Sequence, residues 1–164
     1  MGVAAAGGLR VTVAAVGRDR ASSTRDLFEA YCRRSSWPVR LVEIAPRRGA
    51  PRERRLADEA ERLLRALPDR ALKVALDEHG RQLDSLEFAR QLGRWRERGA
   101  SELGFLIGGP DGLAPSVLEQ AVVVIALGPM TWPHRLVRVM LAEQLYRAET
   151  ILTGHPYHRA GLED

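Results

Sequence analysis

The sequence predicts an α/β protein in which helices sandwich a mainly parallel β-sheet. Strand-like and helix-like stretches alternate almost throughout the 164 residues, as helical crossovers between parallel strands require. The first strand-like stretch, "LRVTVAAV" (residues 9–16), is short, β-branched and mostly apolar, which is typical of a strand buried on both faces. The length suits one domain, which we place at residues 9–159, after a flexible N-terminus (1–8) and before a tail end (160–164).

Five stretches have the β-branched or alternating apolar pattern of a strand. Gly17 ends the first of them, and the turn "EHG" (residues 78–80) closes the third. The predicted strands are residues 9–16, 39–45, 71–77, 103–108 and 122–127.

Helices fill the intervals between these strands. Ser22 and its neighbours can cap a first helix at 25–34, and the second helix begins within a basic segment and carries a leucine stripe to Leu67. Asp84 or Ser85 can cap a third helix, which Gly99 stops. The remaining predicted helices are residues 114–121 and 133–151.

Charge and composition indicate a soluble protein with basic character. The net charge is +4, and arginine supplies nearly all of the positive charge because Lys73 is the only lysine. Arginine forks match phosphate geometry, so a nucleic-acid partner is indicated; the alternative is a solvated surface on which arginine simply replaces lysine. Aromatic residues make up only 5%, which argues against an extended base-stacking platform.

The chain has one cysteine, Cys32, in the amphipathic stretch "RDLFEAYCRR". A single cysteine can form neither an intramolecular disulfide nor a cysteine metal cluster. We expect Cys32 to be a small core residue. No apolar run approaches the length of a membrane span. These features predict a cytoplasmic protein.

Arginines crowd the segment before the second helix, around Gly49 and Pro51. Arg47, Arg48 and Arg52 are the candidates there for contacts with RNA phosphates. The alternative is a solvated helix start. Cations in the first turn of a helix interact unfavourably with the helix dipole. Because this placement costs some stability, it favours a functional role for these arginines.

A glycine-rich turn, "LIGGPDGL" (residues 106–113), follows the fourth strand. It lacks the dinucleotide fingerprint and the Walker lysine, and Pro110 disfavours helical geometry at Gly109. A polyphosphate ligand is therefore disfavoured. Either backbone groups of this turn hold another ligand, or it is a tight turn without one.

Two further segments accompany this turn: "LGPMTWPHRLVRVMLAEQLYRA" (127–148) and "GHPYHR" (154–159). Together with "LIGGPDGL" and the N-terminal "VTVAAVGR", they resemble the RlmH family of the SPOUT superfamily in content, order and spacing. That family methylates a pseudouridine of large-subunit ribosomal RNA. The resemblance covers residues 9–159, while the extension "MGVAAAGG" has no counterpart in it.

The resemblance implies an α/β fold with a C-terminal trefoil knot and a homodimer whose active site lies at the interface. It implies S-adenosylmethionine as cofactor and the ribosome, through its 23S rRNA, as partner. Because this cofactor has no phosphate, glycines would serve to let the backbone close over it. The implied cofactor-binding residues are Leu76, Asp77, Gly108, Gly109, Leu127, Gly128, Pro129, Met130, Thr131 and Trp132.

The implied acceptor is N3 of a pseudouridine, which must lose a proton. His134 is the nearest candidate base to the cofactor loop, and Arg138 follows it on the same helical face. Arg138 would hold a phosphate or stabilise a developing imidate oxygen, and Arg135 would contact the RNA backbone. The alternative for His134 is a helix N-cap or an interface histidine.

The C-terminal tail is expected to face the substrate. Tyr157 would stack on the base or hydrogen-bond to it, and His155, His158 and Arg159 would contact RNA phosphates. A disordered terminus is the alternative. A metal site made of the tail histidines and His134 would have no evident carboxylate support, so we expect no metal.

Two other functions stay open at this point. One is a SPOUT methyltransferase that acts on tRNA or another RNA. The other is a non-catalytic ribosome-binding or assembly protein, against which the intact "LGPMTW" and "LIGGPDG" loops argue. A dinucleotide-dependent enzyme is disfavoured because the phosphate fingerprint is missing.

Overall fold

The computed structural model describes residues 8–160, without the side chains of residues 159 and 160. The predicted flexible N-terminus and most of the tail end therefore lie outside the described residues. Five strands and six helices alternate: β1 (Arg10–Val16), α1 (Ser23–Arg34), β2 (Val39–Ile44), α2 (Arg52–Arg65), β3 (Leu72–Gln82), α3 (Ser85–Glu97), β4 (Glu102–Ile107), α4 (Pro115–Gln120), β5 (Val123–Ala126), α5 (His134–Thr153) and α6 (Tyr157–Ala160).

The strands form one sheet in the order β2-β1-β4-β3-β5, and every pairing is parallel. Val13 of β1 lies opposite Leu41 of β2 on one side and opposite Phe105 of β4 on the other. The predicted α/β class is confirmed. Because all strands run the same way, the loops after β1, β3, β4 and β5 meet at one carboxyl edge, where open α/β sheets bind ligands.

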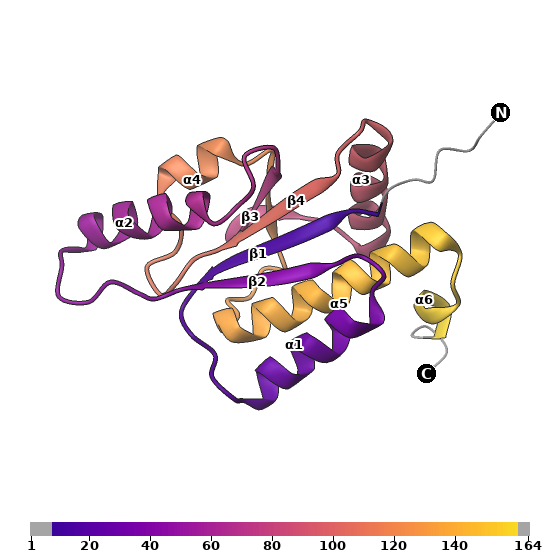
Figure 1. The fold of residues 1–164 in the computed structure, drawn as a ribbon, viewed down its shortest axis with the longest axis horizontal. Coiled ribbons are helices and arrows are strands. Elements are labelled where there is room, and N and C mark those ends of the chain that lie inside the picture. Colours follow the sequence, from indigo (N-terminus) through magenta and orange to yellow (C-terminus); the bar gives the residue numbers. More distant parts are fainter. Residues whose placement is uncertain (1–7, 161–164) are drawn as a thin grey trace.

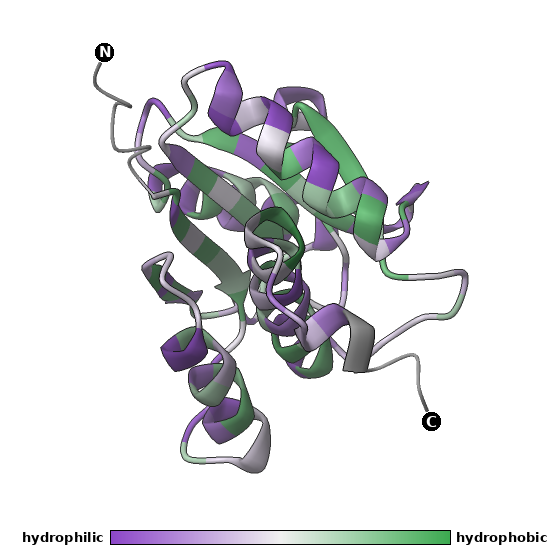
Figure 2. Ribbon diagram, turned by 90° about the vertical axis from the view of Figure 1, so that its right-hand side faces the viewer, coloured by the Kyte–Doolittle hydropathy of each residue, from purple (hydrophilic) through white to green (hydrophobic). Residues whose placement is uncertain are grey.

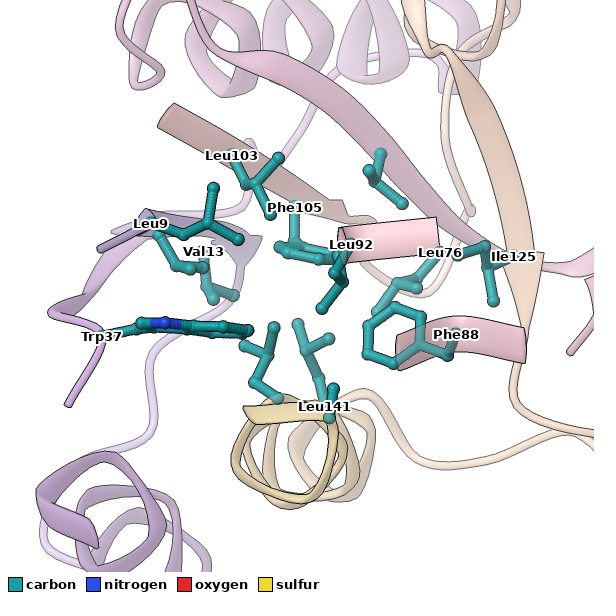
Figure 3. Close-up of a cluster of buried hydrophobic side chains, with 14 of the residues drawn as sticks. Leu9, Val13, Trp37, Leu76, Phe88, Leu92, Leu103, Phe105, Ile125 and Leu141 are labelled. Atoms are coloured by element: carbon teal, nitrogen blue, oxygen red, sulfur yellow. The ribbon is translucent and has the colours of Figure 1, made fainter. Parts of the chain in front are cut away.

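Helices cover both faces of the sheet (Figure 1). Side chains alternate along a strand, so Val11 and Val13 of β1 pack in the core that contains α3 and α5, whereas Ala14 and Val16 pack with α2 and α4. Figure 3 shows the first of these cores, in which Leu141 of α5 lies beneath the side chains of the strands. Hydrophilic residues are concentrated on the surrounding helices and loops (Figure 2).

Helix α1 lies against α5 and touches the sheet core only at its margin (Figure 1). Phe28 of α1 packs with Val139 and Ala142 of α5, and Cys32 adjoins this cluster. Burial, followed by the nearby Glu29 carboxylate, raises the pKa of Cys32 to about 11. The thiol is therefore a packing group, as expected.

One predicted boundary was wrong. The turn "EHG" does not end the third strand, because β3 continues to Gln82 and bulges between Leu76 and Arg81, which both pair with Ile125 of β5. Gly80 makes the bulge possible, since a Cβ there would lie 2.7 Å from the carbonyl carbons of Val124 and Ile125. Residues 77–80 lie between these two pairings and make up the bulge.

Candidate active site at the carboxyl edge

A cavity of about 600 Å³ opens where β3, β4 and β5 end. Its walls are the bulge of β3, the glycine turn after β4 and the loop after β5. The structure brings every predicted cofactor residue except Pro129 to this cavity; those lining it are Leu76, Asp77, Gly108, Gly109, Leu127, Gly128, Met130, Thr131 and Trp132. Three segments chosen from the sequence for their motifs thus meet at one place.

The loop after β5 is fixed by contacts of its own. The indole Nε1–H of Trp132 donates to the carbonyl of Leu127 at 3.2 Å, and the Thr131 hydroxyl donates to the Glu78 carboxylate at 2.6 Å. Gly128 has φ +112°, a conformation that side chains rarely adopt, although nothing lies within 4 Å of the position of its absent Cβ. The loop is therefore preorganised beside an open cavity.

The glycine turn after β4 is closely packed against itself and against β1. A Cβ on Gly108 would lie 2.6 Å from the carbonyl carbon of Gly112, and one on Gly109 would lie 2.9 Å from the Val16 side chain. The Gly112 N–H donates to the Gly109 carbonyl at 2.9 Å, which closes the turn. Packing within the chain is thus sufficient to require glycine at both positions, and the turn forms a wall of the cavity.

Carboxylates outnumber cationic side chains around the cavity. Asp77, Glu78 and Asp111 line it together with a single arginine, Arg52, which is itself 3.7 Å from a carboxylate oxygen of Asp111. His79 is also at the rim, with Nδ1 3.0 Å from Asp77. Such a lining suits a cationic or neutral ligand and disfavours a polyphosphate.

His134 is half-buried at the first position of α5 and lines the cavity. Pro133, not His134, occupies the N-cap position, so the N-cap alternative was wrong. The position of an absent Cβ on Gly17 lies 3.8 Å from His134 Nε2, so the ring lies against the loop after β1. Burial, followed by the positive charges of Arg138 and Arg135, lowers the pKa of His134, so its imidazole is neutral at pH 7.

Arg138 lies behind His134 and is only 2% exposed. Its guanidinium donates to Glu43 at 3.0 Å and to the carbonyls of Val16 and Gly17 at 3.1 and 2.8 Å. Glu43 also accepts from Arg25 at 2.8 Å. An arginine with these partners positions the start of α5 against the end of β1, and does not present its charge to a phosphate.

Glu43 and Asp19, which the sequence did not identify, hold this arrangement together. The Asp19 N–H donates to Glu43 at 2.6 Å, and its carboxylate accepts from Ser22 and Thr24. Burial would raise the pKa of Glu43, but the Asp19 N–H and Arg138 outweigh it and the pKa is lowered. A lone carboxylate in the otherwise apolar stretch 41–45 was the available signal.

The predicted tail residues lie far from His134 within one chain. Helix α5 has 20 residues and thus spans about 30 Å, and Figure 1 shows α6 at its other end. The Tyr157 hydroxyl donates to Glu143 at 3.1 Å and its ring packs edge-on against Tyr146, while burial, followed by the Glu143 charge, raises its pKa to about 12. One chain therefore does not unite His134 and Tyr157.

The other predicted RNA contacts are divided among four places, one of which is the cavity described above, which Arg52 lines. His155 and His158 lie beside Tyr157 and Arg147, where His158 Nδ1 is 3.4 Å from the Arg147 guanidinium, and the side chain of Arg159 lies outside what the structure describes. Arg47 pairs with Asp58 at 3.3 Å. Arg48 and Arg135, by contrast, line a second cleft next to the cavity.

Within residues 8–160, no helix is both long and apolar enough to cross a membrane. The same residues contain no group of three His, Cys, Asp or Glu side chains that could hold a metal ion.

The fold and the cavity agree with a family match that spans residues 9–158 and is described as predicted SPOUT methyltransferase. The chain belongs to the SPOUT methyltransferases and is an enzyme of the methyl-transferring class. It is 53% identical over 152 residues to a protein of Rhodospirillum centenum, and the match covers 93% of this chain and all of that protein. It is 56% identical over 148 residues to a protein of Gluconacetobacter diazotrophicus, and that match covers 90% of this chain and 95% of the relative. Both relatives are named ribosomal RNA large subunit methyltransferase H, as is one of Paramagnetospirillum magneticum at 50% identity, covering 92% and 99%. Within the SPOUT methyltransferases, the chain belongs to their family, which confirms the resemblance found in the sequence.

Proposed function

We propose that the protein methylates N3 of a pseudouridine in 23S rRNA, with S-adenosylmethionine as methyl donor and the assembled ribosome as substrate. The observation that carries this proposal is the single cavity in which the bulge of β3, the turn after β4 and the loop after β5 meet. The names of the relatives support large-subunit ribosomal RNA as the substrate, and the pseudouridine N3 follows from the resemblance to their family.

The lining of the cavity fits this cofactor. S-adenosylmethionine supplies a methyl group activated by a positively charged sulfonium. The carboxylates of Asp77 and Glu78 suit that charge, and the apolar side chains of Leu76, Leu127 and Trp132 suit an adenine ring. The backbone at Gly128 is not covered by a side chain, so its N–H groups can donate to the ring nitrogens of adenine and its carbonyls can accept from the exocyclic amino group.

His134 is the proposed proton acceptor. The N3 proton of the target must leave as the new N–C bond forms, and a neutral imidazole can take it. The lowered pKa of His134 keeps that imidazole unprotonated at pH 7. Arg138 acts through His134: by fixing the start of α5 to the carbonyls of Val16 and Gly17, it sets where the ring stands.

The complete site is proposed to need a homodimer. A second cavity of about 540 Å³ with an apolar lining opens between α1, α3 and α5, and Leu27 at its edge is 47% exposed. A second copy that covers this face would bury it and could bring Tyr157 and the other tail residues to the partner's His134. Sedimentation should then give twice the 18.2 kDa mass of the chain.

Three further features of the proposal follow from the family. The segment after β5 passes through a preceding loop as a trefoil knot. The protein works in the cytoplasm, where ribosomes are. Because it carries no separate RNA-binding domain in residues 8–160, a preformed ribosomal surface is a better substrate than free RNA, which would offer few simultaneous phosphate contacts.

The test is methyl transfer from labelled S-adenosylmethionine to intact ribosomes, isolated large subunits, free ribosomal RNA and tRNA. We expect label on ribosomal particles and little on free RNA. Label on tRNA alone would leave a methyltransferase but overturn the substrate. Absence of label on all four, together with absent cofactor binding, would favour a ribosome-binding protein without turnover.

A further inference from the structure

A second cleft opens beside the cofactor cavity at the same edge of the sheet. Its volume is about 640 Å³, and it lies between the loop after β1, the segment after β2 and the start of α5. His134 and Pro110 line both spaces, so the two share a wall. Any chain lying in the cleft therefore passes directly beside His134.

The cleft is lined by arginines. Four contribute to it: Arg18 and Arg20 from the loop after β1, Arg48 from the segment after β2, and Arg135 from α5. Among the described residues, Arg18, Arg20 and Arg48 form no ion pair, although many other arginines of the chain do, such as Arg55 with Asp111 at 2.7 Å. Three guanidinium groups are therefore free to bind an anion.

The loop after β1 holds two of these arginines outward in a fixed arrangement. Asp19, between them, is 2% exposed and binds the Ser22 and Thr24 hydroxyls, while Arg18 and Arg20 are exposed. Ala21 has φ +33°, which is unusual for a residue with a side chain. The hydrogen bonds of buried Asp19 fix the loop between the two arginines, which lowers the cost of ordering it on binding.

Arg135 joins the loop to α5. Its guanidinium donates to the Arg18 carbonyl at 3.1 Å and lies 3.8 Å from Asp19. Among the described residues that line the cleft none is acidic, and the nearby Asp19 is buried and already engaged, which leaves the lining of the cleft positive. This contrasts with the adjoining cofactor cavity, where carboxylates prevail.

We propose that the cleft formed by Arg18, Arg20, Arg48 and Arg135 holds the phosphodiester backbone of the RNA next to the target nucleotide, and so delivers the base to His134. The inference rests on the proposed function for the identity of the RNA. Guanidinium forks bind phosphate oxygens in pairs and without regard to base sequence, so the cleft sets position and affinity. Arg18 and Arg20 were not identified from the sequence.

The experiment replaces both loop arginines, as Arg18→Gln with Arg20→Gln, and measures binding of purified large ribosomal subunits by co-sedimentation over a range of salt concentrations. The matched control is Arg94→Gln with Arg98→Gln, which removes the same charge at the opposite edge of the sheet, where α3 leads into β4. Methyl transfer to the same subunits and titration with S-adenosylmethionine are measured in parallel.

We expect the loop variant to bind subunits roughly tenfold more weakly and to reduce the slope of log K against log salt by about 1.5, because about two phosphate contacts are lost. The control should match the parent protein, and the cofactor affinity of both variants should be unchanged. The proposed role of the cleft in RNA binding would be refuted if the loop variant matched the control in affinity and slope, or if the parent protein did not bind subunits.

The two proposals fail separately. If the salt dependence of binding changes as expected but the parent protein transfers no methyl group, the proposed function is refuted and RNA binding in the cleft is supported. If the parent protein methylates subunits but the loop variant has an unchanged salt dependence of binding, the proposed function is supported and RNA binding in the cleft is refuted.

Discussion

The ion network behind His134 makes a quantitative prediction about stability. In Glu43→Gln, the side chain keeps its shape but loses its charge. Arg138 then remains buried without a carboxylate partner. The amide oxygen can replace Oε2, which accepts from both Arg138 and the Asp19 N–H, but the amide NH2 then faces the Arg25 guanidinium. Removing one member of a buried pair costs more than the pair contributes, because the other charge stays out of water.

The structure sets the size of this effect. Glu43 accepts three hydrogen bonds, from the Asp19 N–H, Arg138 and Arg25. The Arg25 pair is partly solvated and contributes little. The Arg138 pair is a charged hydrogen bond with one fully buried member, and its loss leads us to expect a decrease of about 3 kcal/mol in the free energy of unfolding.

The assay is urea unfolding at pH 7 and one protein concentration, because oligomerisation makes stability concentration-dependent. With a slope of about 2 kcal/mol per molar urea, the midpoint should fall by roughly 1.5 M. The control is Glu61→Gln, whose partner Arg65 is 75% exposed, and its midpoint should hardly move.

The pH dependence gives a second readout. The pKa of Glu43 is lowered in the folded state, so its contribution is present above its ordinary value of 4.5 and is lost as the pH falls through the lowered value. The difference between parent and Glu43→Gln should therefore be full at pH 7 and shrink below pH 4.5. Equal midpoints at pH 7, or a difference that grows in acid, would refute the network as a stabilising element.

Three further predictions concern the cavity. His134→Gln should lower the rate of methyl transfer about 100-fold or more with little change in cofactor affinity, and an unchanged rate in this variant would show that His134 is not the base. In the parent protein, kcat should fall only below the ordinary histidine pKa, because the pKa of His134 is lowered. Trp132→Phe removes the hydrogen bond to the Leu127 carbonyl, so calorimetry should show cofactor binding weaker by about fivefold; equal affinity would contradict a role for the preorganised loop. Gly128→Ala strains a residue with φ +112° by about 1 kcal/mol, so cofactor affinity should fall while the unfolding midpoint changes little; the reverse pattern would show that Gly128 serves the fold alone.

Most of the fold could be predicted from the sequence because local patterns and the parallel sheet agree. The apolar run at residues 9–16 and the capped helix after Asp84 lie within one or two residues of their predicted places. The end of β3 could not be predicted in this way. "EHG" has the composition of a turn, and only the close approach of Gly80 to β5 shows that the strand continues.

The site was predicted in part, for a physical reason. The loops that line the cavity follow strand ends, and strand ends of a parallel sheet share an edge, so their meeting was predictable. The burial of Arg138 was not, because its partner Glu43 is 95 residues away in the chain. The free arginines at positions 18 and 20 were missed because nothing in the sequence shows that Asp19 between them turns inward.

The proposed reaction can be detected by nucleoside analysis of large-subunit RNA after incubation with the protein and S-adenosylmethionine bearing a deuterated methyl group. We expect one labelled 3-methylpseudouridine per subunit, with label lost in His134→Gln. A deuterated methyl group on another base or on a ribose, or none on RNA from subunits that the protein binds, would contradict this expectation.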